Sequence, residues 1–266
     1  MAAKSKLGQN FLRDPQAIQR IIAALGPLES RTVVEIGPGK GAITEGLAAR
    51  AKQLITIELD RELAWTLQER FSPEKGFHNV AVCRQDVLDF DFAAAARDAG
   101  ESLLVVGNLP YYITSPILLR LAASAASIDR AVVMVQREVA DRVTARPESR
   151  DYGLLSVTLQ LYGRTEPLFT LPPEAFAPPP DVHSTVFRWI FAPRFAELNV
   201  EEAPFIAFLK QCFAQKRKTL SNNLRAAGQS ADRAADAFSD TGISPQIRAE
   251  ALTVEELAAI WRTLSR

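Results

Sequence analysis

"TVVEIGPGKGAITEGLAAR" (residues 32–50) connects an apolar run to an amphipathic run through a turn in which three glycines alternate with other residues. The apolar run, TVVEIG (32–37), is typical of a short buried strand. AITEGLAAR (42–50) instead carries its apolar residues at helical spacing. Because glycine lets the backbone turn sharply and approach a ligand closely, the stretch predicts a strand, a tight turn and a helix.

The same alternation of strand-like and helical stretches continues along the first two-thirds of the chain. Helical stretches such as RELAWTLQERF and PILLRLAAS separate the apolar runs. Strands that alternate with helices are usually parallel and joined by right-handed crossovers, which predicts an open α/β sheet with mostly parallel strands. Besides 32–37, the predicted strands are 53–59, 80–84, 103–108 and 130–136.

The pattern changes after about residue 163. The stretch 163–191 is rich in proline and then strand-like, which predicts two final strands around an ordered loop and seven strands in all. Beyond it the pattern is helical to the end of the chain. We therefore divide the sequence into an α/β domain, residues 1–191, and a small all-helical domain, residues 192–266.

Three helix starts carry capping signals. Asp14 and Ser115 each precede a proline, which puts a capping side chain ahead of a proline at the first helical position. Thr253 and Glu256 have the spacing of a capping box. These signals predict that helices begin directly after the three capping residues.

The composition argues against several classes of protein. Thirty-one basic residues balance thirty-one acidic ones, so a nucleic-acid site must be a local patch. Two cysteines form neither a disulfide framework nor a zinc cluster, which predicts a reducing, cytoplasmic setting. Two histidines leave little material for histidine-dependent triads or metal sites, and we expect no metal. No apolar run approaches the roughly 18 residues of a membrane span, and no secretion signal is predicted.

Acidic side chains follow the glycine turn at the ends of the next two strands. Glu58 lies about twenty residues after the glycines, where an acid can bind ribose hydroxyls. Asp86 can accept a hydrogen bond from an adenine amino group. Each acid alone is more readily explained as a helix cap or a solvated residue, and the glycine turn can be a simple connection between strand and helix. Together they mark the ligand-binding edge of a parallel sheet, and the lack of a phosphate motif favours S-adenosylmethionine over NAD.

The sequence GNLPYY places an amide at the end of the fourth predicted strand. An adenine amino group is a weak nucleophile, and acceptors for both of its N–H groups can orient its lone pair toward a methyl donor. The Asn108 side-chain oxygen and the Leu109 carbonyl suit this role. Pro110 fixes the turn, and Tyr111 offers a stacking face for a flipped-out base. The alternative is a turn whose aromatic rings only fill a gap, and Tyr112 either packs beneath the site or contacts RNA.

One segment, 210–225, carries five basic residues and no acidic one, several of them on one side of a predicted helix. It is the best candidate for phosphate contacts, with an ordinary solvated surface as the alternative. The segment 136–150, with a net charge of about +1, and the N-terminal lysines in KSK are weaker candidates. The five residues of the basic segment are Lys210, Lys216, Arg217, Lys218 and Arg225.

Six short motifs in this order resemble the ribosomal RNA adenine dimethyltransferase family: GQNFL, EIGPGKG, ELD, QDVL, GNLPY and FAPPPDVHS. The resemblance spans essentially the whole chain and is closest to the small-subunit branch. It implies a Rossmann-like methyltransferase fold and S-adenosylmethionine as methyl donor. It also implies transfer of two methyl groups to each of two adjacent adenosines near the 3′ end of small-subunit rRNA.

The resemblance also implies roles for individual residues. Asn108, Leu109, Pro110 and Tyr111 form the active-site motif, and Phe176 packs on the target base opposite Tyr111. The predicted S-adenosylmethionine contacts are Asn10, Leu12, Glu35, Gly37, Gly39, Glu58, Asp86 and Asn108.

Other interpretations stay open within this resemblance. One is a large-subunit rRNA dimethyltransferase of the macrolide-resistance type, and another is a ribosome-assembly checkpoint factor whose methylation is secondary. A mitochondrial transcription-factor relative is less favoured because no transit peptide is recognised. We expect a monomer that contacts the small ribosomal subunit. Trp65 and Trp261, at helical spacing among apolar residues, are predicted to lie in the core.

Overall fold

The computed structural model describes residues 10–265 and divides the chain into two compact units. The first unit comprises the chain up to Ala140 together with residues 165–191. The second comprises residues 141–164 and the chain from Ala192 onward. One junction lies after residue 191, where the sequence analysis divides the chain. The segment 141–164 was expected in the α/β domain but groups with the helical unit.

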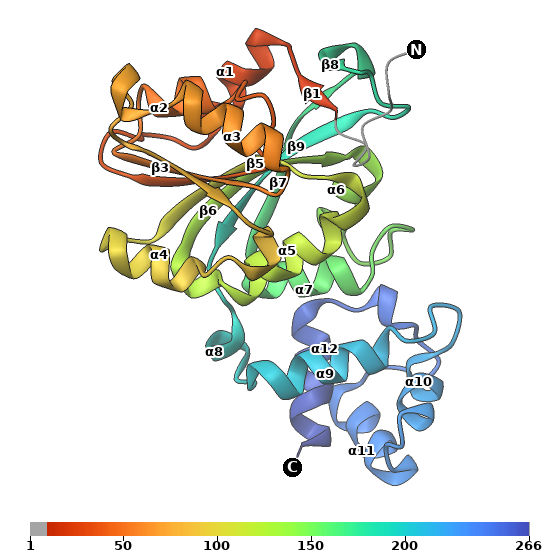
Figure 1. Cartoon of the computed structure of the whole chain (residues 1–266). Helices are drawn as coiled ribbons and strands as arrows, with labels where there is room; N and C mark the ends of the chain where they lie inside the picture. The colour runs from red at the N-terminus through yellow and green to blue at the C-terminus, as the bar shows by residue number, and fades with distance from the viewer. Residues whose placement is uncertain (1–9, 266) are drawn as a thin grey trace. The chain divides into compact units, whose positions relative to one another are not determined.

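A seven-stranded sheet forms the centre of the first unit (Figure 1). Its order is β4-β3-β2-β5-β6-β9-β7. The first five strands in this order pair in parallel, and β9 pairs antiparallel with β6. The predicted Rossmann-like fold with a mostly parallel sheet is therefore confirmed. The strands are β2 (Thr32–Ile36), β3 (Gln53–Glu58), β4 (Val80–Arg84), β5 (Leu103–Asn108), β6 (Ile128–Gln136), β7 (Gly163–Leu171) and β9 (Ser184–Phe191).

Strands β2 and β5 lie side by side in the middle of the sheet. Every residue of β2 and the first five of β5 are buried, as the continuous apolar runs of two-sided parallel strands require. At Gly107 a side chain has no room, because an added Cβ would lie 2.6 Å from the Ile36 carbonyl oxygen. Glycine at this position therefore lets the carboxyl ends of the two central strands approach closely.

Helices cover both faces of the sheet (Figure 1). Helices α1 (Pro15–Ala24), α2 (Thr44–Ala48) and α3 (Arg61–Arg70) lie on one face, and α4 (Phe92–Ala99) and α5 (Thr114–Ala123) lie on the other. The α1 cap is confirmed, because the Asp14 carboxylate accepts hydrogen bonds from the backbone N–H groups of residues 16 and 17. The start of α5 was predicted too late.

The early start of α5 has a local cause. A 3₁₀ turn, Tyr111–Ile113, runs directly into the helix at Thr114, so Ser115 lies inside the first turn and does not cap it. The Thr114 hydroxyl donates to the Pro110 carbonyl over 3.0 Å and ties the turn to the helix. Proline is tolerated at residue 116 because N–H groups in the first helical turn have no partner within the helix.

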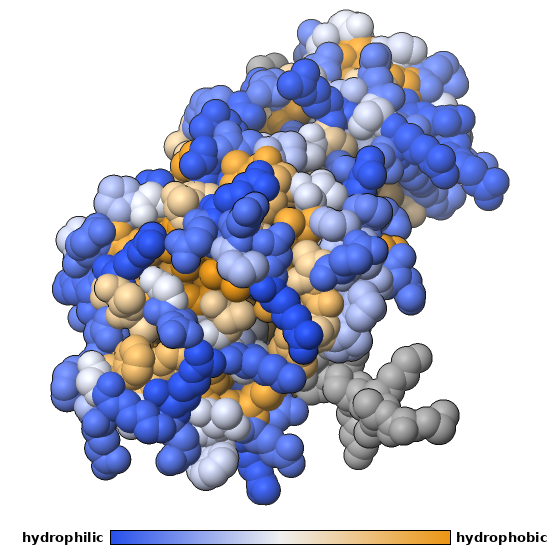
Figure 2. Space-filling view, turned by 90° about the horizontal axis from the view of Figure 1, so that it is seen from above, coloured by the Kyte–Doolittle hydropathy of each residue, from blue (hydrophilic) through white to orange (hydrophobic). Residues whose placement is uncertain are grey.

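The apolar core between α1, α2 and the sheet is built from residues such as Ile22, Leu47 and Val33. The prediction that Trp65 belongs to a core is wrong, because its side chain is 63% exposed on α3. Its neighbours Ala64 and Leu67 form the buried side of that helix. Exposed apolar side chains interrupt a mostly hydrophilic surface in several places (Figure 2).

Two short strands lie outside the main sheet. Strand β1 (Phe11–Leu12) pairs antiparallel with β8 (Phe176–Ala177), and Leu12 faces Phe176 in this register. The pairing joins the beginning of the described chain to the loop between β7 and β9.

In the second unit, every regular element from residue 192 to 265 is helical. Trp261 packs on Phe208, with 5.1 Å between ring centroids. The capping box is confirmed by reciprocal hydrogen bonds between Thr253 and Glu256. Among the described residues, no helix is both long and apolar enough to cross a membrane. The remaining helices are α6 (Arg137–Val143), which spans the junction of the units, α7 (Leu154–Tyr162), α8 (Phe195–Leu198), α9 (Glu202–Cys212), α10 (Leu220–Ala226), α11 (Ala231–Thr241) and α12 (Val254–Leu264).

Candidate active site and RNA-contact loop

A pocket lies at the carboxyl edge of the parallel strands in the first unit. Strands β3 and β4 lie on one side of β2, and strands β5 and β6 lie on the other. The direction in which the strand order advances therefore reverses between β2 and β5. Open α/β sheets bind ligands at this reversal of strand order. The structure brings together here all the residues predicted to contact S-adenosylmethionine and the four residues of the Asn-Leu-Pro-Tyr motif. The lining residues are 10–12, 35–40, 42–43, 57–59, 85–87, 108–113 and 117.

The glycine turn after β2 forms one wall of the pocket. Gly37 and Gly39 have positive φ angles of 62° and 57°, a region that side chains rarely adopt. An added Cβ at Gly39 would lie 2.9 Å from the Phe11 ring. The Phe11 ring therefore packs directly on the turn, and only glycine allows this contact.

Glu58 is held rigidly at the end of β3. Its carboxylate accepts hydrogen bonds from the backbone N–H of Gly39 at 3.1 Å and of Asp60 at 2.9 Å. Burial raises the pKa of Glu58, and the two backbone N–H donors lower it in part. A carboxylate held in this way is suited to accept hydrogen bonds from a polar ligand.

Asp86 and apolar side chains form another wall of the pocket. One oxygen of Asp86 accepts a hydrogen bond from the Leu88 N–H at 2.9 Å and caps the following short turn. Leu59 lines the pocket and is 49% exposed, which leaves an apolar surface facing the space. The sequence analysis missed Leu59. The available signal was an apolar residue directly after an acidic strand end.

Glu35 lies beneath the glycine turn and is only 1% exposed. The Thr44 hydroxyl donates a hydrogen bond to its carboxyl over 2.7 Å. Burial raises the pKa of Glu35 to about 8, the Thr44 hydrogen bond lowers it in part, and the charge of Glu58 raises it further. At neutral pH this carboxyl is therefore mostly protonated in the free protein.

Glu35 should make the stability of the protein depend on pH. Its ordinary pKa is 4.5 and its folded pKa about 8, so between these values the folded state keeps a proton that the unfolded state has lost. The free energy of unfolding should fall by up to about 5 kcal/mol as pH rises through this window, at about 1.4 kcal/mol per pKa unit.

Glu35→Gln tests this dependence, because glutamine imitates the protonated acid and keeps an acceptor for Thr44. We expect the variant to lose this component of the pH dependence. Urea unfolding of both proteins at about pH 5 and about pH 9 measures it. Parallel changes in the two proteins would show that Glu35 is ionised when folded.

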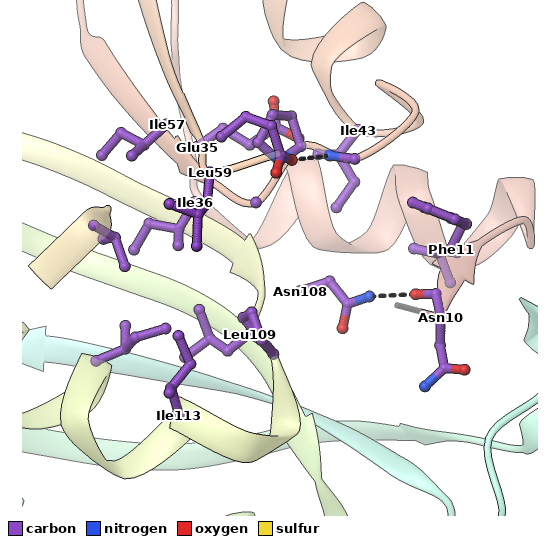
Figure 3. Close-up of a pocket in the computed structure, with 18 of the residues that line it drawn as sticks. Asn10, Phe11, Glu35, Ile36, Ile43, Ile57, Leu59, Asn108, Leu109 and Ile113 are labelled. Carbon is purple, nitrogen blue, oxygen red and sulfur yellow. Dashed lines mark hydrogen bonds between the residues drawn. The ribbon is translucent and has the colours of Figure 1, made fainter. Parts of the chain in front are cut away.

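The orientation of the Asn108 amide follows from its neighbour. Its side-chain nitrogen donates a hydrogen bond to the Asn10 carbonyl over 2.8 Å. A carbonyl only accepts hydrogen bonds, so the amide nitrogen must face it. The Asn108 side-chain oxygen consequently points away from Asn10 into the open space of the pocket (Figure 3).

The turn that follows Asn108 is fixed by backbone hydrogen bonds. The Leu109 N–H donates to Met134 on β6 over 2.9 Å, and the Pro110 carbonyl accepts from the Ile113 N–H. Neither bond uses the Leu109 carbonyl. Tyr112 is 59% exposed at the pocket, which excludes the interpretation that it packs beneath the site.

Two residues differ from the predicted arrangement of the pocket. Phe176 is absent from its lining, and its ring is only 4% exposed in the core next to Leu12. Lys40 lines the pocket although the sequence analysis gave it no role, and its ammonium lies 4.7 Å from the centre of the Phe11 ring. Among the described residues, no group of three or more histidine, cysteine or acidic side chains is arranged to hold a metal.

The predicted basic segment lies in the second unit and consists of two helix ends joined by a loop. Lys210 lies on α9 and Arg225 on α10, but residues 213–219 are not helical, so the prediction of one helical surface is wrong. The buried Asn223 amide donates to the carbonyls of Cys212 and Gln215 and accepts from the Gln215 N–H. These side-chain bonds compete with helix continuation.

The loop carries Lys216, Arg217 and Lys218, all exposed. Lys216 donates to the Arg150 carbonyl over 2.7 Å and lies 3.8 Å from the Glu250 carboxylate. The third candidate RNA segment, the lysines of KSK, lies outside the described residues.

Known proteins resemble this chain in sequence and in fold. Residues 1–265 match the family described as "Ribosomal RNA adenine dimethylase". An Acidobacterium capsulatum protein named "Ribosomal RNA small subunit methyltransferase A" is 61% identical over 261 residues, 98% of this chain and 91% of that protein. The crystal structure of a dimethyladenosine transferase from Plasmodium falciparum has a TM-score of 0.81 at 23% identity, covering 94% of this chain and 95% of that one. For 23S rRNA methyltransferase ErmE the TM-score is 0.72 at 26% identity, covering 97% and 100%.

Proposed function

The chain belongs to the ribosomal RNA adenine dimethylase family, and we propose that it transfers methyl groups to adenosine amino groups of small-subunit rRNA. The observation that carries the proposal is the Asn108 side-chain oxygen, which points into the pocket at the carboxyl edge of β5. The name of the Acidobacterium capsulatum relative supports the small subunit as substrate. The fold does not discriminate, because a 23S rRNA methyltransferase shares it.

The pocket residues fit S-adenosylmethionine. When bound, S-adenosylmethionine supplies a methyl group on a positively charged sulfur. Glu58 presents a carboxylate for ribose hydroxyls, and Asp86 has a second oxygen for the adenine amino group. The exposed side chain of Leu59 would offer an apolar contact for the face of the adenine ring. Glu35 places a buried carboxyl in a pocket for a cationic ligand, and the glycines keep the turn free of side chains.

Asn108 and Leu109 act on the target amino group. The Asn108 side-chain oxygen accepts from one N–H and the Leu109 carbonyl from the other, which orients the nitrogen lone pair toward the methyl donor. The same two oxygens stabilise the positive charge that develops on the nitrogen. The Asn10 carbonyl holds the Asn108 amide in the orientation that this role needs.

Two aromatic residues support the flipped-out base in this proposal. Tyr111 offers a ring at the pocket wall, and base–aromatic stacking is sequence-tolerant and strong enough to hold a base outside its helix. Phe176 is assigned to the opposite face by its motif alone. Because its ring is buried beside Leu12, that role requires the ring to leave this position when RNA binds.

The basic loop supplies the RNA contact. Lys216, Arg217 and Lys218 bring three positive charges to one exposed loop, and phosphate neutralisation by such residues dominates nucleic-acid affinity. We assign catalysis to residues 1–191 and rRNA contact to residues 192–266. The substrate sites are two adjacent adenosines near the 3′ end, and the enzyme acts as a cytoplasmic monomer.

Labelled methyl transfer tests the proposal. Small ribosomal subunits that lack the modification should accept label from S-adenosylmethionine, and large-subunit RNA should not. Label on the large-subunit RNA would favour the macrolide-resistance type of enzyme. Tight binding to small subunits without methyl transfer would favour an assembly factor.

A further inference from the structure

Ser184 connects the late proline-rich motif to the active-site motif. Its hydroxyl and that of Tyr111 lie 2.6 Å apart, although the two residues are separated by 73 positions in the sequence. Ser184 is fully buried at the start of β9, whereas Tyr111 stands at the pocket. A buried hydroxyl without a partner is costly, so this hydrogen bond explains why a polar residue is tolerated there.

The sheet fixes the position of Ser184 relative to Asn108. Asn108 pairs with Met134 on β6, and Met134 pairs with Val186 on β9. Ser184 lies two residues before Val186 on the same strand. Three adjacent strands therefore hold the anchor of the Tyr111 ring and the Asn108 amide in one rigid frame.

We propose that Ser184 is a positioning residue that holds the Tyr111 ring in the orientation for stacking on the target base. This inference rests on the proposed function. Without the hydrogen bond, the ring keeps its bulk but gains rotational freedom about its side-chain torsions. The flipped-out base would then be held less well against Asn108, and a small misplacement of reacting groups slows a reaction strongly.

A neighbouring residue provides a matched control. Thr185 follows Ser184 on β9, and its hydroxyl also pairs with another hydroxyl, that of Thr170, at 2.9 Å. That bond lies within the sheet and does not reach Tyr111. Thr185→Val should therefore change stability without changing the rate of methyl transfer.

The test is a double-mutant cycle with single-turnover methyl transfer to small subunits that lack the modification, at saturating S-adenosylmethionine. Ser184→Ala and Tyr111→Phe each break the same bond, so each should lower the rate by roughly 3- to 10-fold. The double variant should be no slower than either single variant. Ser184→Thr, which keeps the hydroxyl, should restore most of the rate, and the affinity for S-adenosylmethionine should stay unchanged throughout.

The outcomes separate the two proposals. The role of Ser184 would be overturned if the rate loss of the double variant were the product of the losses of Ser184→Ala and Tyr111→Phe. A Thr185→Val variant as slow as Ser184→Ala would overturn it too. If Ser184→Ala does not fold, Tyr111→Phe carries the test, and a wild-type rate in that variant overturns the inference. A wild-type enzyme that does not methylate small subunits would instead refute the proposed function itself.

Discussion

Replacing Asn108 with alanine is expected to lower the rate of methyl transfer by about 100- to 1,000-fold, the loss typical for one preorganised electrostatic group in an active site. The change removes the side-chain oxygen that points into the pocket and leaves the Leu109 carbonyl as the remaining acceptor. The substitution changes no residue of the basic loop in the second unit. Binding to small subunits, measured by co-sedimentation, should therefore stay close to that of the wild type.

Asn108→Asp keeps a side-chain oxygen as acceptor but removes the N–H group that fixes the orientation of the side chain. The carboxylate still offers an oxygen to the target amino group, but it cannot donate to the Asn10 carbonyl as the amide does. We expect its rate to lie between those of the alanine variant and the wild type. Equal rates for all three proteins would remove Asn108 from the mechanism.

The second large effect is expected from the basic loop. Changing Lys216, Arg217 and Lys218 together to alanine removes three exposed charges from one loop of the second unit. If each neutralises one phosphate, the slope of log affinity against log salt should flatten by roughly 2 to 3 units. The loss of affinity should be largest at low salt, where counterion release contributes most.

A matched triple variant controls for net charge. Lys52, Lys75 and Arg97 are also exposed, and they lie near the amino ends of β3, β4 and β5, away from the pocket edge. Their replacement by alanine removes the same total charge. Binding measured over a salt series should keep its wild-type slope in this control. An identical slope of log affinity against log salt in both triple variants would show that the basic loop does not bind phosphates.

The fold was predictable because its decisive signals are local. Two-sided burial makes the central parallel strands continuous apolar runs, and the predicted runs match β2, β3, β4, β5 and β6 within two residues at each end. The errors arose where hydrophobic spacing and capping signals do not report which side-chain contacts form. The hydrogen bond from the Thr114 hydroxyl to the Pro110 carbonyl makes α5 begin earlier than predicted. The Trp65 ring is exposed although its spacing matches a core helix.

The pocket was predictable because parallel strands end at one edge, so Glu58, Asp86 and Asn108 had to converge. The interactions that tune it were not. The hydrogen bond from Asn108 to Asn10 spans 98 positions, and no periodicity signals such a contact. The raised pKa of Glu35 depends on burial by the whole unit, which a sequence pattern does not report.

The basic loop shows the same limit in the second unit. Its charges are visible in the sequence, but its shape depends on the buried amide of Asn223. An asparagine in an exposed helix and one that organises a loop have the same sequence signature. Only the partners of its side chain distinguish the two.

The central claim is that the methyl group is transferred to an adenosine amino nitrogen held by Asn108. Mass analysis of nuclease fragments of small-subunit rRNA, and of the nucleosides within them, is the decisive test after unmodified subunits have reacted with the enzyme and labelled S-adenosylmethionine. The wild type should give labelled dimethyladenosine at two adjacent positions, and Asn108→Ala should give almost none. Label on ribose or on another base, or equal dimethyladenosine from both proteins, would contradict it.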